Sequence, residues 1–186
     1  MYKFLSLLFI FSFLACAEEP EPKPYGQIRI DLPETHEFKT FEPDSCGYSI
    51  DISRISGIVK RKEDCWFNIV YPRYNATIHL TYRSIEGNLP ELVNDARYLI
   101  MKHSVKADGL REQGFMNPEK RVYGMLVDVL GNAANSLQFY LTDSTDHFLR
   151  GALYFNAPPN RDSLDPVIDF IRDDMQYMME SVTWKD

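Results

Sequence analysis

Three apolar, strand-forming segments follow one another between residues 121 and 155, and they limit the folds that this sequence can adopt. The segments are rich in Val, Leu, Phe and Tyr, and they are separated only by the short sequences GNAA and STD. β-Branched and aromatic residues favour strands, and connections this short join antiparallel neighbours. The run therefore predicts three consecutive antiparallel strands, which are RVYGMLVDVLG (121–131), NSLQFYLTD (135–143) and HFLRGALYF (147–155).

Earlier segments carry the same signal. In ATIHLTYR (76–83), Ile78, Leu80 and Tyr82 alternate with Thr and His, which predicts a strand with one buried and one polar face. Three further segments are also predicted strands, the first of them an edge strand because it stops at a proline. They are GQIRIDLP (26–33), YSIDIS (48–53) and CWFNIVYP (65–72).

Two segments switch to helical spacing. Residues 89–107 place apolar side chains three and four apart, with Asn88 and Pro90 as start signals and Gly109 as a stop. Residues 163–182 carry a second apolar stripe. We therefore expect an α+β fold, a mainly antiparallel sheet packed by two longer helices. This order of elements resembles the Mog1/PsbP-type α/β sandwich.

The start of the chain has the form of an export signal. Lys3 precedes an apolar run from Phe4 to Ala15, which has the length of a secretory signal core and is too short to span a bilayer. Leu14, Ala15 and Cys16 resemble a bacterial lipobox, in which the Cys is acylated and becomes the new N-terminus. The alternative is an ordinary cleaved signal with a coincidental Cys.

The residues after Cys16 predict a tether. Residues 16–25 are rich in Pro and Glu, a composition that buries little and stays extended. We expect residues 1–15 to be a signal peptide, residues 16–25 to be a lipidated tether and residues 26–186 to be one globular domain.

Composition excludes some partners and suggests one covalent link. The net charge is −7 and basic residues cluster only at Lys60, Arg61 and Lys62, so nucleic acid is not an expected partner. Export places Cys46 and Cys65 in an oxidising compartment, where we expect a disulfide, although two buried free thiols are the alternative. The Cys and His spacings predict no metal site.

The sequence predicts no catalytic group and no cofactor. DSTDH (143–147) holds Asp, Ser and His, but one hairpin turn explains these residue types, and no nucleophile-elbow motif accompanies them. Asp173 and Asp174 are interpreted as a solvated helix face. The remaining histidines show no metal-ligand spacing; they are His36, His79 and His103.

Arg150 is the candidate for an interaction site. It lies in an aromatic strand beside Gly151, and the segment NAPPNRD follows that strand. Protein interfaces favour arginine and exposed aromatic residues, so Arg150, Phe148, Pro158 and Pro159 form a candidate contact patch. The alternative is a strand arginine that simply faces solvent.

Long stretches of the sequence resemble one family, the gliding motility-associated lipoprotein GldD of gliding bacteria with a type IX secretion system. The resemblance covers most of residues 46–184. It is carried by CWFNIVYPRYNATIHLTYR (65–83), NDARYLIMKHSVKADG (94–109), the run from RVYGMLVDVLG to NAPPNRDSLDPV (121–167) and SVTW (181–184). It implies a lipid-anchored cell-envelope protein needed for gliding, acting with other gliding lipoproteins and type IX secretion components, and it supplies no catalytic residues.

Two tripeptides resemble the O-glycosylation signal that such bacteria use on exported proteins. They begin at Asp143 and Asp162, and the candidate acceptors are Ser144 and Ser163. A helix-capping role is the alternative at Ser163.

The resulting expectation is a non-enzymatic accessory lipoprotein at the outer membrane that supports the gliding and secretion machinery. The alternative is a periplasmic or surface module, or an enzyme, that binds a glycan or lipid.

Overall fold

The structure is a computed structural model that describes residues 30–103, 107–133, 135–157 and 160–185. The signal sequence, Cys16, the tether and the prolines Pro158 and Pro159 lie outside the described residues. The helices and strands follow in the order β1 Phe38–Phe41, β2 Tyr48–Ser53, β3 Gly57–Lys60, β4 Trp66–Tyr71, the short 3-10 helix η1 Pro72–Tyr74, β5 Ala76–Ser84, α2 Leu89–His103, β6 Gly109–Asn117, β7 Val122–Leu130, β8 Asn135–Thr142, β9 His147–Phe155, α3 Arg161–Ser181 and β10 Thr183–Trp184.

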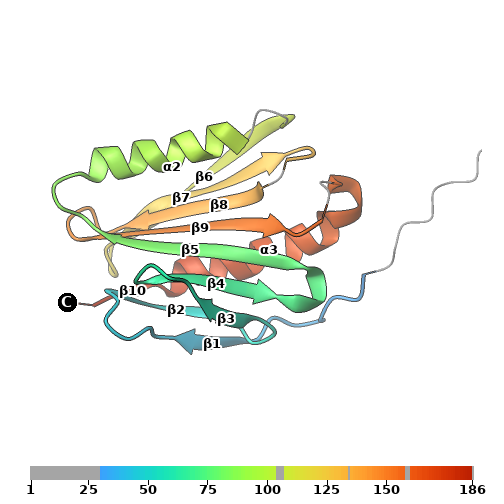
Figure 1. The fold of residues 1–186 in the computed structure, drawn as a ribbon, viewed down its shortest axis with the longest axis horizontal. Helices are drawn as coiled ribbons and strands as arrows, with labels where there is room; N and C mark the ends of the chain where they lie inside the picture. Colours follow the sequence, from blue (N-terminus) through green and yellow to red (C-terminus); the bar gives the residue numbers. More distant parts are fainter. Residues whose placement is uncertain (1–29, 104–106, 134, 158–159, 186) are drawn as a thin grey trace, which may run out of the picture.

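The strands form two antiparallel sheets. The large sheet has seven strands in the order β3-β4-β5-β9-β8-β7-β6, and the small sheet has three in the order β1-β2-β10. The hairpin turns predicted between residues 121 and 155 join β7 to β8 and β8 to β9 as antiparallel neighbours. The α+β fold class is therefore confirmed (Figure 1).

One face of the large sheet is fully covered. Its inward side chains, such as Ile78, Leu141 and Leu149, share one core with Ile168 and Met175 of α3. The small sheet covers the rest of this face, because Phe41 of β1 meets Phe67 of β4 edge to face at 4.9 Å. Figure 1 shows α3 behind the large sheet, with the small sheet alongside β3 and β4.

The opposite face is covered only in part. Helix α2 lays Leu92 and Ala96 on Tyr140 of β8 and Phe148 of β9, and these four buried side chains form a second, smaller cluster. Among the described elements, α2 makes its main sheet contacts with β8 and β9. In the part of the chain that the structure describes, no helix packs mainly on the β3–β4–β5 half of this face.

Several elements differ from the sequence-based expectation. The predicted strand over 26–33 is wrong for residues 30–33, which form no strand although Ile30 and Leu32 pack against the core. Residues 26–29 lie outside the described part. Helix α2 is described as far as His103; residues 104–106 lie outside the described part, and Ala107, the predicted last residue, is not helical. Helix α3 begins at Arg161, two residues earlier than predicted. Four strands were missed, which are β1, β3, β6 and β10.

The missed strands share a physical reason. Strand β6 exposes most of its side chains, β1 and β3 have four residues each, and β10 has two. Short or edge strands need no apolar alternation, so the period-two signal is absent from them. Neither helix of the described residues is long and apolar enough to cross a membrane.

Candidate functional site

A groove lies between α2 and the sheet strands that α2 leaves uncovered. It has a volume of about 200 Å³. One wall comes from α2, and the floor comes from β4, β5 and β9. We call it the α2 groove, and its lining residues are Trp66, Thr81, Arg83, Leu92, Asp95, Ala96, Leu99, Phe148 and Arg150.

The register of the sheet puts the polar floor residues in line. Trp66 pairs with Thr81 across β4 and β5, Thr81 pairs with Arg150, and Arg150 pairs with Tyr140 on β8. Directly opposed residues point to the same face of a sheet. Tyr140 packs under α2, whereas Trp66 lies two strands beyond β9, so this row runs from beneath the helix into the open half.

Arg150 is fixed in the groove floor. Its guanidinium donates to the Oε1 atom of Gln138 at 2.5 Å, and it is hydrogen-bonded to the Tyr154 hydroxyl. Burial lowers the pKa of Arg150, and Tyr154 opposes that shift. An arginine side chain nevertheless stays charged in proteins, so the groove floor carries a fixed cation. The Nε2 atom of buried Gln138 has no hydrogen-bond partner among the described residues.

Arg83 provides a second cation of a different kind. It is exposed on β5, opposite Phe148 of β9, and it makes no hydrogen bond or ion pair with any described residue. Asp95 is the acidic residue of the lining, and it is exposed on the α2 wall. The sheet side of the groove is therefore positive, although the whole chain carries −7.

Polar side chains continue this face beyond the groove. His79 of β5 shares a 2.8 Å hydrogen bond with the Oδ1 atom of Asn68 through its Nδ1 atom, and its ring meets Tyr154 edge to face. Burial lowers the pKa of His79, and Arg61 and Arg150 lower it further. The lowered pKa of His79 favours its neutral form.

The predicted contact patch around Arg150 is only partly brought together. Phe148 is 4% exposed under α2, so the expectation of an exposed aromatic residue is wrong at this position. Its burial follows from the α2 helix, which packs Leu92 and Ala96 over that strand. Arg150 lies in a groove rather than on a flat face, and Pro158 and Pro159 lie outside the described residues.

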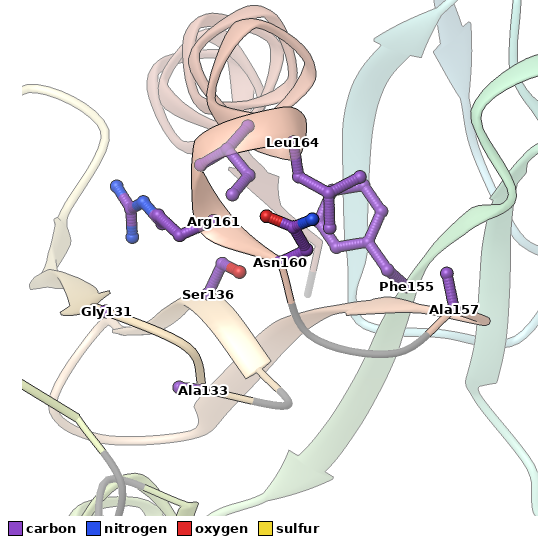
Figure 2. Close-up of a pocket in the computed structure, with 9 residues that line it drawn as sticks. Gly131, Ala133, Ser136, Phe155, Ala157, Asn160, Arg161 and Leu164 are labelled. Atoms are coloured by element: carbon purple, nitrogen blue, oxygen red, sulfur yellow. The ribbon is translucent and has the colours of Figure 1, made fainter. Parts of the chain in front are cut away.

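The described part of the NAPPNRD segment lies away from Arg150. Figure 2 shows Asn160 near Ser136 at the first turn of α3, which packs on the other face of the sheet, and Ala157 below Phe155. The cavity in this view has a volume of about 10 Å³, which is room for one water molecule. We therefore do not consider it a ligand site.

A further hollow lies beside the Cys46–Cys65 disulfide. The two residues are bonded in the structure, and the hollow has a volume of about 310 Å³. Its rim carries Asp44 and Asp64 from loops and Lys60 from the end of β3, with Phe67 as the large apolar side chain of its lining. It lacks the long apolar wall that α2 gives to the groove.

The DSTDH turn is built as a structural unit. The Oδ1 atom of Asp143 accepts hydrogen bonds from the backbone N–H groups of Thr145, Asp146 and His147 at 2.8–3.0 Å. Ser144 lies exposed at the tip with a left-handed backbone, φ 76°. The Nδ1 atom of His147 is instead hydrogen-bonded to the Tyr82 hydroxyl at 2.8 Å, so it is not paired with Ser144.

The other glycosylation candidate lies in a helix. Ser163 is half-buried in the first turn of α3, where its backbone N–H donates to the Oδ1 atom of Asn160 at 3.4 Å. The capping side chain is therefore that of Asn160, not that of Ser163.

The interpretation of Asp173 and Asp174 as a solvated pair is wrong for Asp174. Asp174 is completely buried, and it accepts hydrogen bonds from His36 at 2.7 Å and from the Tyr71 hydroxyl at 2.9 Å. Asp173 is exposed, as expected. This arrangement fixes the segment before β1 to α3, and three residues so far apart in the chain give no local sequence signal.

A second buried carboxylate was also missed. Asp128 of β7 is 1% exposed, and its carboxylate is held by Arg161 and Arg172 of α3, with Arg111 of β6 at 3.9 Å. Buried charges in proteins are normally paired in this way. The site therefore ties α3 to the sheet, and its role is structural.

These features define an α+β body whose large sheet is closed on one face and bears an arginine-lined groove on the other. The sequence model of the family described as Gliding motility lipoprotein GldD matches residues 17–184, and the chain therefore belongs to this family. A search of curated proteins gives no match. Family membership makes the chain a lipoprotein associated with gliding motility and a membrane-anchored protein of the cell envelope.

Proposed function

We propose that this lipoprotein is a non-catalytic accessory of the gliding and type IX secretion machinery, anchored to the outer membrane through Cys16. The observation that carries the proposal is the family match, which begins at the residue after Cys16 and runs through the whole folded body. A lipid-anchored body with a binding groove suits a protein that holds another envelope component in place.

The buried polar groups support a structural rather than catalytic use. Asp174 and Asp128 are each saturated by side chains that tie α3 to the rest of the fold. Asp143 is saturated by its own turn. A general acid or base must instead reach a substrate from a cleft, and none of these three acids lines the α2 groove.

A module that binds a glycan or lipid is the second candidate, because the α2 groove offers it a place. The groove of about 200 Å³ is smaller than the roughly 300–1,000 Å³ of sites for drug-sized ligands. This difference favours insertion of part of a larger partner over enclosure of a whole small ligand.

The test is genetic. The gene is deleted in its source strain and restored as wild type or as Cys16→Ala, and colony spreading and export of surface adhesins are scored at matched protein levels. We expect deletion to stop spreading, wild type to restore it and Cys16→Ala to fail. Loss of adhesin export on deletion would support the secretion part of the proposal. Normal spreading of the deletion strain would overturn the proposal.

A further inference from the structure

We infer that the α2 groove docks a segment of a partner protein that presents an apolar side chain next to a carboxylate. The inference deepens the proposed function, on which it rests, by naming the surface that holds the partner and the chemistry that the surface recognises.

The helix side of the groove supplies the apolar half of the recognition. Leu92, Ala96 and Leu99 face the groove from successive turns of α2, and Phe148 lies at its floor. Trp66 closes the far end from β4. A volume of about 200 Å³ suits one large aliphatic or aromatic side chain, and removing that side chain's apolar surface from water favours binding.

The sheet side supplies the charged half. Arg83 has no partner among the described residues, and Arg150 is held in place by Gln138 and Tyr154. A guanidinium presents a planar fork of N–H donors that matches a carboxylate. Two arginines on the sheet side of the groove therefore favour a carboxylate as the partner group beside the apolar side chain.

The single acid of the lining sets the orientation. Asp95 is on the α2 wall, opposite the two arginines, so a partner carboxylate placed against the helix would be repelled. The bound segment must therefore turn its carboxylate to the strands and its apolar side chain to Leu92 and Leu99.

The surface beyond the groove favours a polypeptide over an acyl chain. The open half of the face continues from Thr81 into the half-buried polar side chains His79 and Asn68. Beyond the hydrogen bond that they share, such groups have further donors and acceptors that can bond to the backbone of an extended segment and that an acyl chain could not satisfy. Trp and Arg are also the residue types that most often dominate protein–protein binding energy.

The two tryptophans of the chain allow a direct test. Trp66 lines the α2 groove, whereas Trp184 is stacked on His147 at a ring distance of 5.1 Å, on the opposite face of the sheet. The full-length lipoprotein is labelled with fluorotryptophan, placed in lipid nanodiscs and titrated while the two fluorine NMR signals are followed. A Trp66→Phe variant assigns the signals.

The probes are three short, capped peptides that differ in one group each, together with sodium octanoate. The first peptide is acetyl-Ser-Gly-Phe-Glu-Gly-Ser-amide, the second replaces its Glu with Gln, and the third replaces its Phe with Ser. We expect the first peptide to shift the Trp66 signal alone, and to half-saturate it at a concentration about tenfold below that of either other peptide.

Variants test whether the two arginines cause the preference for the Glu peptide. Arg83→Gln and Arg150→Gln are each expected to remove most of the difference between the Glu and Gln peptides, with the Trp184 signal unchanged as the check on folding. Lys102→Gln removes an exposed charge from α2 at a residue that does not line the groove, and it is expected to leave peptide binding unaltered.

Four results would overturn the inference. They are equal binding of the Glu and Gln peptides, a shift of Trp184 instead of Trp66, no shift with any peptide, and octanoate binding more tightly than the first peptide, which would assign the groove to an acyl ligand. These results do not depend on the gliding phenotype. Failure of the groove and failure of the accessory role are therefore distinguishable.

Discussion

The two faces of the seven-stranded sheet are built from the same strands but are covered to different extents. The α3 face is closed by a long helix and a second sheet, and its buried acids Asp128 and Asp174 are fully paired. The α2 face is closed over β8 and β9 and left open over β3, β4 and β5, and Arg83 at the boundary pairs with none of the described residues. The difference indicates that the first face holds the fold together and that the second is available for contact.

The largest contrast is expected between two acids. Asp128→Ala removes the carboxylate that holds Arg161 and Arg172 and leaves those half-buried cations uncompensated, so it should lower the free energy of unfolding by about 3–5 kcal/mol. Asp95→Ala, on the exposed wall of the groove, should change it by less than about 0.5 kcal/mol. Urea denaturation at neutral pH compares them. Equal destabilisation would remove the distinction between the faces.

The disulfide stabilises the side of the small sheet. Cys46 precedes β2, and Cys65 precedes β4. The bond closes a loop whose ends are 19 positions apart, and its loss should cost roughly 3 kcal/mol through the entropy of the unfolded chain. Denaturation of the Cys46→Ser/Cys65→Ser variant measures this loss. Reductant should destabilise wild type to a similar degree and leave the variant unchanged, and an insensitive wild type would contradict the prediction.

A smaller contrast is expected between two glycines. A Cβ atom at Gly151, on the α3 face of β9, would lie 2.2 Å from the Phe139 ring, so Gly151→Ala should destabilise by about 1–3 kcal/mol. Gly114 of the edge strand β6 has no atom within 4 Å of such a Cβ, and Gly114→Ala should change stability by less than about 0.5 kcal/mol. Thermal unfolding ranks the two, and a reversed order would contradict the packing of the α3 face.

The smallest effect is expected at the β8–β9 turn and depends on pH. Burial raises the pKa of Asp143, but the hydrogen bonds from His147, Asp146 and Thr145 outweigh it and lower the pKa to about 2. A lowered pKa in the folded state means that Asp143 stabilises the fold fully above its ordinary pKa of 3.8, and that this contribution is lost as pH falls through about 2.

The measurement is unfolding stability against pH. Asp143→Asn should flatten the acid-induced loss of stability between about pH 4 and pH 2, whereas Asp146→Asn at the exposed neighbour should leave the profile as in wild type. An unchanged profile for Asp143→Asn would show that other carboxylates control acid unfolding.

The sequence predicts the covered parts of this fold better than the open ones. Alternation in ATIHLTYR and the dense segments between residues 121 and 155 correspond to β5, β7, β8 and β9, because burial on at least one face imposes a period on the residues. Strand β6 has Arg111, Glu112 and Gln113 in succession. Because these side chains are exposed to solvent, apolar and polar residues do not alternate there. A strand that exposes most of its side chains shows little apolar pattern in its sequence.

The groove shows a similar limit. The aromatic residues around Arg150 in the sequence predict an interaction site there, and the structure places Arg150 on the groove floor. Trp66 and Arg83 were not singled out, because nothing local distinguishes a strand residue beneath a helix from one beside it. Their meeting depends on the register between β4, β5 and β9, which is a property of the whole sheet.

The contrast between the two sheet faces implies that the protein binds its partner through the open half of the α2 face. The most direct measurement is colony spreading of the deletion strain restored with Arg83→Glu of β5, compared with the strain restored with Lys102→Glu on the exposed side of α2. Both variants reverse one exposed charge, and both should accumulate at the wild-type level. The account predicts that Lys102→Glu spreads like wild type and that Arg83→Glu does not. Normal spreading of a stable Arg83→Glu strain would contradict it.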